Sequence, residues 1–162
     1  MGKQSRRQRD IRAPIQLDLG CGRNKQQGFI GLDRTAWPGV DIVHDIEELP
    51  WPLEDGSCGV IKASHVMEHI KPWFTIPVMD EAWRVLEDGG VMLISMPYGT
   101  GYRYVQDPTH CNPWNETTPA YFCPAHDLYE IYRPKPWHLE NLFWLHERDM
   151  EVAFRKIADQ SE

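Results

Sequence analysis

The sequence predicts an α/β domain in which an open, mostly parallel sheet forms the middle of three layers and ends in an antiparallel hairpin. Short apolar runs, several of them ending on glycine or an acidic residue, recur between residues 15 and 97. A longer run with helical periodicity separates the last two of them, which is typical of a strand-helix-strand unit. Residues 138–157 instead alternate apolar and polar side chains, and this pattern favours a hairpin.

The first three strands are expected in quick succession. The run 15–20, bounded by a proline and a glycine, is typical of a buried parallel strand, and 28–33 forms the next run. The segment 23–27 between them is shorter than the roughly twelve residues that a parallel crossover needs. We therefore expect the first helix to be cut to a turn or lost. A third strand is expected at 40–45, where the run ends on a second acidic residue.

The next unit has a clearer helical signature. A fourth strand is expected at 58–66, and apolar residues recur with helical spacing over 73–86. The glycine pair at 89–90 is expected to end that helix, since glycine is common just after a helix C-terminus. A fifth strand follows at 91–96.

The last third of the chain divides into a loop and a hairpin. Residues 98–136 are rich in Pro, Tyr, His and Trp and have weak periodicity, apart from a short helix expected at 118–122. Long irregular segments in compact domains are usually lids or binding loops, so this one is expected on the substrate side. The hairpin pairs 138–147 with 150–157 and turns at residues 148 and 149.

The size and composition indicate one domain, which we place at 14–162. A chain of 162 residues can bury a single sizeable core but not two of ordinary size. Hydrophobic residues make up 41%, and no apolar run approaches the roughly 18 residues that a membrane span needs. This composition argues against a membrane protein. We expect a cytoplasmic location and have no basis for predicting the oligomeric state.

The charge is unevenly distributed along the chain. The formal net charge is −7, yet the first twelve residues hold five basic side chains and one acidic one. We interpret residues 1–13 as a basic, disordered leader. Contact of this arm with nucleic acid is the alternative, and it is not favoured because the rest of the chain is strongly acidic.

The cysteines offer no strong metal motif. None of the four belongs to a C-x-x-C pair, so reduced thiols packed as small apolar groups are expected. Cys123 and His126 stand at C-x-x-H spacing, with His110 and Cys111 upstream, which leaves a zinc site as the alternative. The sequence-based prediction is that no residue binds a metal.

The most informative motif is a glycine turn after the first strand. Residues 17–22 read Leu-Asp-Leu-Gly-Cys-Gly, and Asp33 closes the next strand. Gly20 and Gly22 have no side chains, so a ligand can approach the backbone closely there. The carboxylate of Asp33 can accept hydrogen bonds from both hydroxyls of a ribose. Dinucleotide-binding turns need a third glycine where this chain has Lys25, so a nicotinamide dehydrogenase is disfavoured. A ligand without phosphates, S-adenosylmethionine above all, fits better.

These motifs together resemble the class I, Rossmann-like methyltransferases that use S-adenosylmethionine. The matching segments are 17–22, 29–33, 40–70 and 81–97. More narrowly, the chain is similar to a small type 11-like group with a shortened first helix and a D-P-T-H segment, here 107–110. The resemblance implies a seven-stranded sheet with the hairpin at its C-terminal end. The residues after D-P-T-H lack the aromatic pair expected in that group, so the substrate does not transfer.

The resemblance implies a cofactor site along the strand ends, made of Asp18, Gly20, Cys21, Gly22, Asp33, Asp45, Ile46, Ser64 and His65. The methionine part of the cofactor is expected against the glycine turn, with Asp18 near its ammonium group. Asp33 is expected to bind the ribose, and Asp45 and Ile46 the adenine. Ser64 and His65 are expected beside the sulfonium.

The catalytic candidates are His110, His65 and Asp107, because each lies near a predicted strand end or in the loop that follows. A base assists only if the methyl acceptor is a hydroxyl or an amine. His110 is the first choice, since its loop follows the fifth strand. A histidine that pins this loop by hydrogen bonds is the alternative interpretation.

The sequence thus favours an S-adenosylmethionine-dependent methyltransferase acting on an unidentified small molecule, glycan or protein. Two other classes stay open. One is a non-catalytic protein that binds S-adenosylmethionine or S-adenosylhomocysteine, which the lost first helix favours. The other is a nucleic-acid-modifying methyltransferase guided by the basic arm, whose binding would depend strongly on salt.

Overall fold

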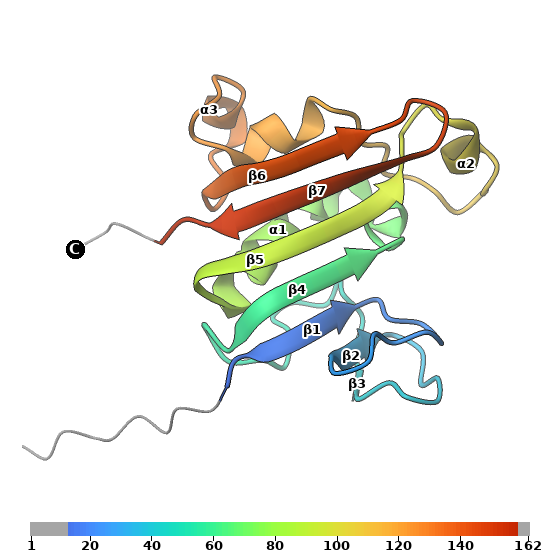
Figure 1. The fold of residues 1–162 in the computed structure, drawn as a ribbon, viewed down its shortest axis with the longest axis vertical. Helices are drawn as coiled ribbons and strands as arrows, with labels where there is room; N and C mark the ends of the chain where they lie inside the picture. The colour runs from blue at the N-terminus through green and yellow to red at the C-terminus, as the bar shows by residue number, and fades with distance from the viewer. Residues whose placement is uncertain (1–12, 159–162) are drawn as a thin grey trace, which may run out of the picture.

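A computed structural model describes residues 13–158, which form one seven-stranded sheet with its helices (Figure 1). The strands are β1 (Ile15–Leu19), β2 (Ile30–Asp33), β3 (Ile42–Val43), β4 (Cys58–Ser64), β5 (Leu86–Pro97), β6 (Trp137–Trp144) and β7 (Asp149–Lys156). The α-helices are α1 (Thr75–Val85), α2 (Tyr102–Val105) and α3 (Tyr129–Tyr132), and the 3₁₀ turns are η1 (Met67–His69), η2 (Pro72–Phe74) and η3 (Thr118–Phe122).

The strand order is β3-β2-β1-β4-β5-β7-β6, which confirms the mixed sheet with a C-terminal hairpin. Strands β1 to β5 are mutually parallel, and β7 runs antiparallel between β5 and β6. Leu17 of β1 pairs with Ile30 of β2 on one side and with Ile61 of β4 on the other. Since β1 is central to the parallel part, its apolar side chains Leu17 and Leu19 are fully buried.

Within the described residues, no helix connects β1 to β2, as the short spacing predicts. The chain turns back at once, because the carbonyl oxygen of Leu32 accepts hydrogen bonds from the backbone N–H groups of Gly20 and Cys21, at 2.8 and 3.3 Å. Strand β3 is shorter than the expected 40–45. Asp41, just before β3, donates its backbone N–H to the carbonyl of Gly31 at 3.0 Å, and its Oδ2 accepts from the backbone N–H of the same residue at 2.7 Å.

The end of the main helix differs from the prediction. Helix α1 ends at Val85, and β5 begins at Leu86, five residues earlier than expected. Leu86 pairs with Cys58 and Val91 with Val60, so residues 87–90 form a bulge in the ladder opposite Gly59. The glycine pair lies within this bulge, where Gly89 has φ +75°, and does not cap the helix.

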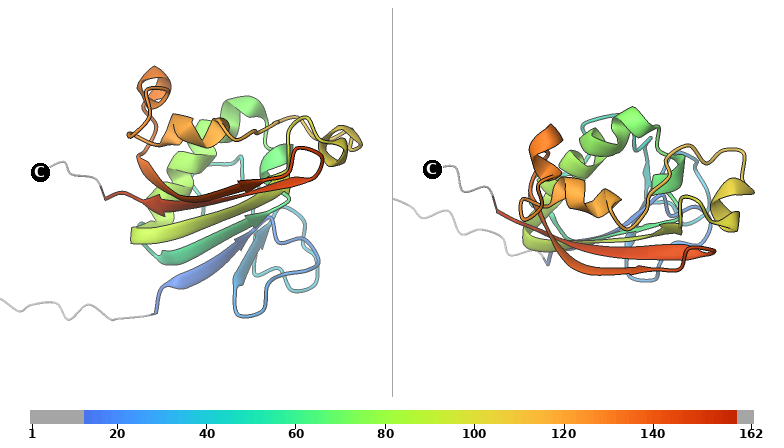
Figure 2. Two further views of the ribbon diagram at one scale, coloured as in Figure 1. Left: turned by 45° about the horizontal axis from the view of Figure 1, so that its top comes forward. Right: turned by 90° about the horizontal axis from the view of Figure 1, so that it is seen from above.

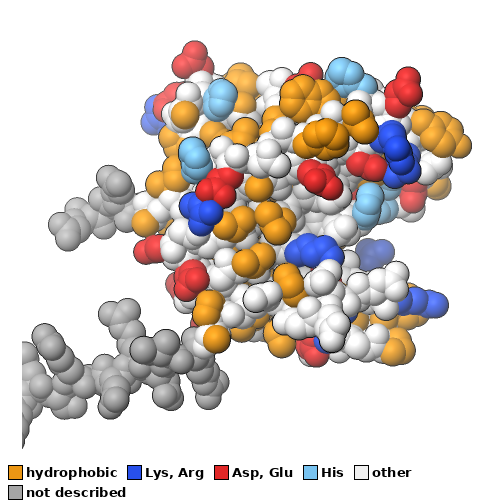
Figure 3. Space-filling view, viewed as in Figure 1, with side chains coloured by type: hydrophobic (Ala, Val, Ile, Leu, Met, Phe, Trp, Pro, Cys, Tyr) orange, Lys and Arg blue, Asp and Glu red, His pale blue; other side chains and the backbone are white. Residues whose placement is uncertain are grey.

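The helices gather on one face of the sheet. Figure 2 shows α1, η3 and α3 on the same side, so the expected third layer is not formed by residues 13–158. Burial follows this arrangement: Ile61 and Ala63 of β4 are fully buried toward α1, whereas Lys62 between them is partly exposed. Figure 3 views the face without helices, where Leu93 of β5 is 42% exposed and Phe143 of β6 is 51% exposed.

Residues 98–136 are irregular but anchored to the sheet. Turn η3 occupies 118–122 as predicted, in the 3₁₀ form. Trp114 stacks on Phe122 at a ring-centroid distance of 5.8 Å, and Phe122 meets Phe154 of β7 edge to face at 6.1 Å. Trp114 and Phe122 are both buried, so they fasten the segment to the sheet.

The C-terminal hairpin forms with slightly shifted ends. It turns at residues 145–148, where the backbone N–H of Leu145 donates to the carbonyl of Asp149 and that of Arg148 donates to the carbonyl of Leu145. The sequence predicts the turn at residues 148 and 149, but Asp149 already belongs to β7 and the turn begins three residues earlier. No helix among residues 13–158 combines the length and apolarity needed to cross a bilayer.

Candidate functional site

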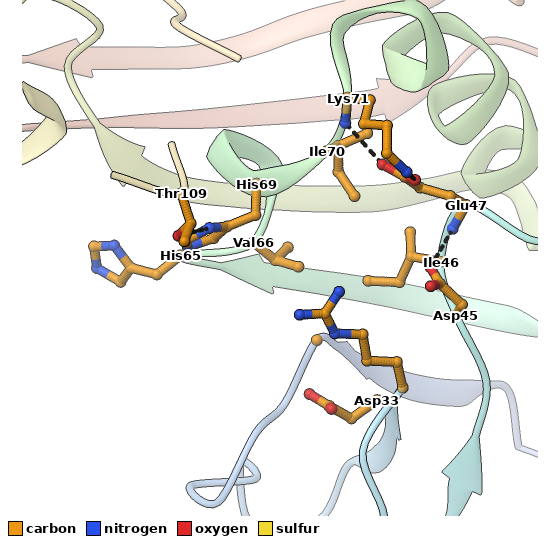
Figure 4. A pocket seen from close by; sticks show the side chains of 12 residues that line it. Asp33, Asp45, Ile46, Glu47, His65, Val66, His69, Ile70, Lys71 and Thr109 are labelled. Carbon is orange, nitrogen blue, oxygen red and sulfur yellow. Dashed lines mark hydrogen bonds and ion pairs between the residues drawn. The ribbon is translucent and has the colours of Figure 1, made fainter. Parts of the chain in front are cut away.

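A cavity of about 460 Å³ lies at the carboxyl ends of β1, β2, β3 and β4 (Figure 4). Ligand sites of open α/β sheets are found at this edge. Its lining residues come from the four strand ends, from the segment around η1 and from the loop after α2: Gly20, Asp33, Arg34, Asp45, Ile46, Glu47, His65, Val66, His69, Ile70, Lys71 and Thr109.

The glycine turn forms one wall of the cavity. Gly20 has φ +65°, and a Cβ atom placed on it would lie 2.4 Å from Cγ2 of Val66. Gly22 has φ +54° and open space where its Cβ would be. Both positions therefore require glycine for the backbone conformation, and Gly20 also requires it because another segment approaches so closely.

Asp33 at the end of β2 faces this turn. One carboxylate oxygen, Oδ2, accepts a hydrogen bond from the backbone N–H of Gly22 at 2.9 Å, and Oδ1 accepts one from Thr35 at 2.8 Å. Each oxygen keeps a second lone pair for a ligand. The acid and the turn are thus joined directly across the strand ends.

The wall after β3 is built from Asp45, Ile46 and Glu47. Asp45 Oδ1 accepts from the backbone N–H of Glu47 at 2.9 Å. The buried indole of Trp51 donates to the carbonyl of Ile46 at 2.9 Å, which holds the Ile46 backbone against the core. Glu47 pairs with Lys71 from the other side of the cavity, and this hydrogen bond raises the pKa of the Lys71 ammonium.

Four predicted cofactor residues do not line this cavity: Asp18, Cys21, Gly22 and Ser64. Asp18 is 3% exposed and accepts a hydrogen bond from the backbone N–H of Gln26 at 2.6 Å, so it shapes the short connection to β2. Cys21 is buried within the turn, and burial is the main cause that raises the pKa of its thiol. Ser64 has the same orientation along β4 as Lys62 and lines a depression on the face without helices.

His65 lines the cavity in a strained conformation. Its φ of +54° is uncommon for a residue with a side chain, and such outliers cluster at functional sites. Its Nδ1 lies 3.4 Å from Oε1 of Glu68. The interaction with Glu68 is the main cause that raises the pKa of the His65 imidazole.

The other two catalytic candidates lie behind this wall. His110 is mostly buried, and its Nδ1 donates a hydrogen bond to the carbonyl of Tyr104 at 2.8 Å, as the loop-pinning interpretation predicts. Asp107 Oδ1 accepts from the backbone N–H and the hydroxyl of Thr109, and the former lowers the pKa of the Asp107 carboxyl most. Neither lines the cavity, although Thr109 between them does.

Sequence reasoning missed Glu68. This residue is 1% exposed, and its backbone carbonyl accepts hydrogen bonds from the N–H groups of Cys111 and Asn112, at 2.9 and 3.1 Å. These contacts fasten the loop 107–112 to η1 and bring His110 beside Glu68. Glu68 follows His65 by three residues and directly precedes His69. This spacing of an acid between two histidines is the sequence pattern that could have indicated it.

The structure does not assemble the alternative Cys/His zinc site. Cys123 is buried under η3, and burial raises the pKa of its thiol to about 11, whereas His126 is exposed. Among residues 13–158, the group of histidine, cysteine and carboxylate side chains close enough to share an ion is Glu68, His69 and His110.

Comparisons with known proteins agree with this geometry. A family model described as a methyltransferase domain matches residues 22–94, from the glycine turn to β5. A probable S-adenosylmethionine-dependent methyltransferase of Mycolicibacterium smegmatis is 33% identical over 117 residues. Residues 22–94 belong to this family of S-adenosylmethionine-dependent methyltransferase domains. The match covers 61% of this chain and 44% of the mycobacterial protein, so it spans less than half of that relative.

Solved methyltransferase structures share the fold. An S-adenosylmethionine-dependent methyltransferase from Archaeoglobus fulgidus has a TM-score of 0.66 at 17% identity, covering 88% of this chain and 86% of that one. The 1,6-didemethyltoxoflavin-N1-methyltransferase of Burkholderia thailandensis, solved with S-adenosylhomocysteine, has a TM-score of 0.64 at 13% identity, covering 90% of this chain and 72% of that one. At such low identity these likenesses concern the fold alone.

Proposed function

We propose that this domain binds S-adenosylmethionine in the cavity at the strand ends and transfers its methyl group to an acceptor. The observation that carries the proposal is the direct hydrogen bond between Gly22 of the glycine turn and Asp33, on the wall of a cavity, in a chain of this family. The acceptor is proposed to be a small molecule, a glycan or a protein, because the acidic body is unsuited to polyanions.

The residues present fit this cofactor. The backbone of Gly20 lines the cavity, and the open space beside Gly22 is proposed to admit the methionine part. Asp33 is proposed to accept the ribose hydroxyls through its remaining lone pairs. Asp45 and the apolar Ile46 are proposed to hold the adenine, one by accepting from its amino group and the other by packing on its ring.

The bound cofactor supplies an electrophilic methyl group on a sulfonium. The tasks of the chain are to position an acceptor atom in line with that methyl group and to exclude water. His65 and His69 stand on the cavity wall opposite Asp33 and are proposed to contact the acceptor (Figure 4). Methyl transfer of this kind requires no covalent intermediate with the protein.

The test of the proposal is calorimetric titration of the wild type and the Asp33→Ala variant with S-adenosylmethionine and S-adenosylhomocysteine. Losing a charged acceptor of ribose hydrogen bonds is expected to weaken both ligands about 10- to 100-fold. Asp127→Ala, which removes an exposed carboxylate that does not line the cavity, serves as the control and is expected to bind normally. Equal affinity of wild type and Asp33→Ala would remove the ribose contact from the proposal.

A second candidate function is ligand binding without turnover, which the absence of a helix between β1 and β2 favours. Such a protein binds S-adenosylhomocysteine as the proposal expects. It does not convert labelled S-adenosylmethionine to S-adenosylhomocysteine with any acceptor tried. The calorimetric test and a turnover assay therefore separate the two functions.

A further inference from the structure

Glu68 is a buried acid with an unused oxygen. The residue is 1% exposed, and its Oε2 has no hydrogen-bond partner among residues 13–158. His65 approaches the other oxygen, Oε1, at 3.4 Å. Burying a carboxylate oxygen without a partner is costly, so this oxygen calls for a cation or a donor that the described residues do not supply.

His69 presents an unprotonated nitrogen because of its partners. The hydroxyl of Thr109 donates its single proton to Oδ1 of Asp107 at 2.7 Å, so Thr109 can only accept from Nδ1 of His69, 3.1 Å away. Nδ1 of His69 therefore carries the proton. In the neutral ring its Nε2 is left with a free lone pair.

His110 has the same tautomer for a different reason. Its Nδ1 lies 2.8 Å from the carbonyl oxygen of Tyr104, which can only accept, so Nδ1 donates. In the neutral ring Nε2 is left with a lone pair; it lies 4.0 Å from Oε1 of Glu68 and 3.7 Å from Oδ2 of Asp107. The rings of His69 and His110 meet edge to face, with centroids 4.7 Å apart. Metal-binding histidines usually donate their other ring N–H to a carbonyl or another fixed acceptor in this way.

We propose that Glu68, His69 and His110 bind a divalent transition-metal ion. The ligand atoms that these three residues offer lie within 4.8 Å of one another. Metal–ligand bonds of about 2.1 Å place neighbouring ligands roughly 3 to 4 Å apart, so a small contraction completes the site. Two imidazoles and one carboxylate favour zinc, cobalt or iron over magnesium, which prefers oxygen ligands.

The loop contacts explain how the site is held together. His110 comes from the loop 107–112, whereas Glu68 and His69 belong to η1. The hydrogen bonds from the backbone N–H groups of Cys111 and Asn112 to the carbonyl of Glu68 fix the distance between this loop and η1. Asn112 also donates through its side-chain amide to the carbonyl of Met67 at 2.9 Å. The ligand set thus rests on backbone anchoring at two successive residues of η1.

The position of the ion gives it a place in the reaction. His69 and its partner Thr109 both line the cavity, so the ion lies at the cavity edge. Three protein ligands leave coordination positions open. Those positions would be open to an acceptor oxygen or nitrogen and would hold it toward the methyl group; this last step rests on the proposed function.

The test uses Co²⁺ as a spectroscopic probe with the full chain, any histidine tag having been removed. The wild type is expected to bind one equivalent, with a visible absorption band that reports nitrogen and oxygen ligands. His69→Asn and His110→Asn are each expected to weaken Co²⁺ binding about 100-fold or more. Losing a residue that only orients a metal ligand typically weakens metal binding about 10- to 100-fold. His126→Asn removes an exposed histidine far along the chain and is expected to leave binding unchanged.

Two outcomes would overturn the proposal: the absence of a stoichiometric Co²⁺ band in the wild type, or equal binding by the wild type and both ligand variants. Because His69 is exposed, its variant is expected to fold even if changes at buried Glu68 do not. Titration with S-adenosylhomocysteine keeps the two proposals apart. Asp33→Ala is expected to bind Co²⁺ normally, and His69→Asn is expected to bind S-adenosylhomocysteine normally.

Discussion

The cavity has two walls that are built in different ways. The first, from the ends of β1, β2 and β3, consists of backbone geometry and strand-end acids within thirty residues of sequence, as at Gly20, Asp33 and Asp45. The second, around η1, depends on a loop forty residues further along, which places His110 beside Glu68. The first wall is fixed by local hydrogen bonds and the second by long-range packing. The two walls should therefore respond separately to substitution.

The largest effect is expected from Gly20→Ala, which breaks the first wall. The new Cβ must avoid Val66, whose Cγ2 lies 2.4 Å from the ideal position, and the backbone keeps φ +65°. Overlap and strain together are expected to lower the free energy of unfolding by about 3 kcal/mol, with loss of S-adenosylhomocysteine binding. Denaturant unfolding and calorimetry measure the two effects.

Gly39→Ala is the matched control for this substitution. Gly39 also has a left-handed backbone, with φ +93°, but nothing lies within 4 Å of the position of its Cβ. It should cost about 1 to 2 kcal/mol, from the backbone alone. If Gly20→Ala and Gly39→Ala lower the free energy of unfolding equally, the close approach of Val66 does not explain why residue 20 is a glycine.

The second wall is tested by Thr109→Val, which keeps the side-chain shape but removes the hydroxyl. That hydroxyl links His69 to Asp107, at 3.1 and 2.7 Å. Without it the tautomer of His69 is no longer fixed, and Co²⁺ affinity is expected to fall about tenfold. Thr100→Val, at an exposed position, controls for loss of a surface hydroxyl. Unchanged affinity in Thr109→Val would show that Thr109 does not orient His69.

The smallest effect is a difference in thiol reactivity between the walls. Cys21 in the glycine turn is buried, and burial, followed by the charges of Asp18 and Asp33, raises the pKa of its thiol. A raised pKa leaves less thiolate at a given pH, so alkylation slows. Cys111 in the second wall is exposed. Mass spectrometry after brief iodoacetamide treatment at pH 8 should find Cys111 modified first; faster labelling of Cys21 would contradict its burial.

The same contrast explains what could be predicted from the sequence. The glycine turn and Asp33 were accessible because a strand, a turn and the next strand follow each other within about twenty residues and their chemistry is local. The burial of Glu68 was not accessible, because it depends on contacts with Cys111 and Asn112 across the fold. Charged residues are usually exposed, so a buried carboxylate is not expected from the residue type alone.

Two differences between the sequence-based prediction and the structure have local physical causes. Ser64 was expected in the cofactor site, but alternation along β4 gives it the orientation of Lys62, and the chain turns toward the cavity only at His65 with its left-handed backbone. The sequence predicts that the helix ends at the glycines, whereas they form part of a bulge within β5. Strand pairing, rather than helix capping, decides the conformation at that point.

The hydrogen bonds at Leu32 and Asp33 have a consequence for ligand affinity. The carbonyl of Leu32 accepts from Gly20 and Cys21, and the carboxylate of Asp33 accepts from Gly22, so all three turn residues are fastened to β2 before any ligand arrives. A ligand that binds both the glycine turn and Asp33 therefore meets two binding points whose separation is already fixed. Preorganisation of this kind lowers the entropy lost on association.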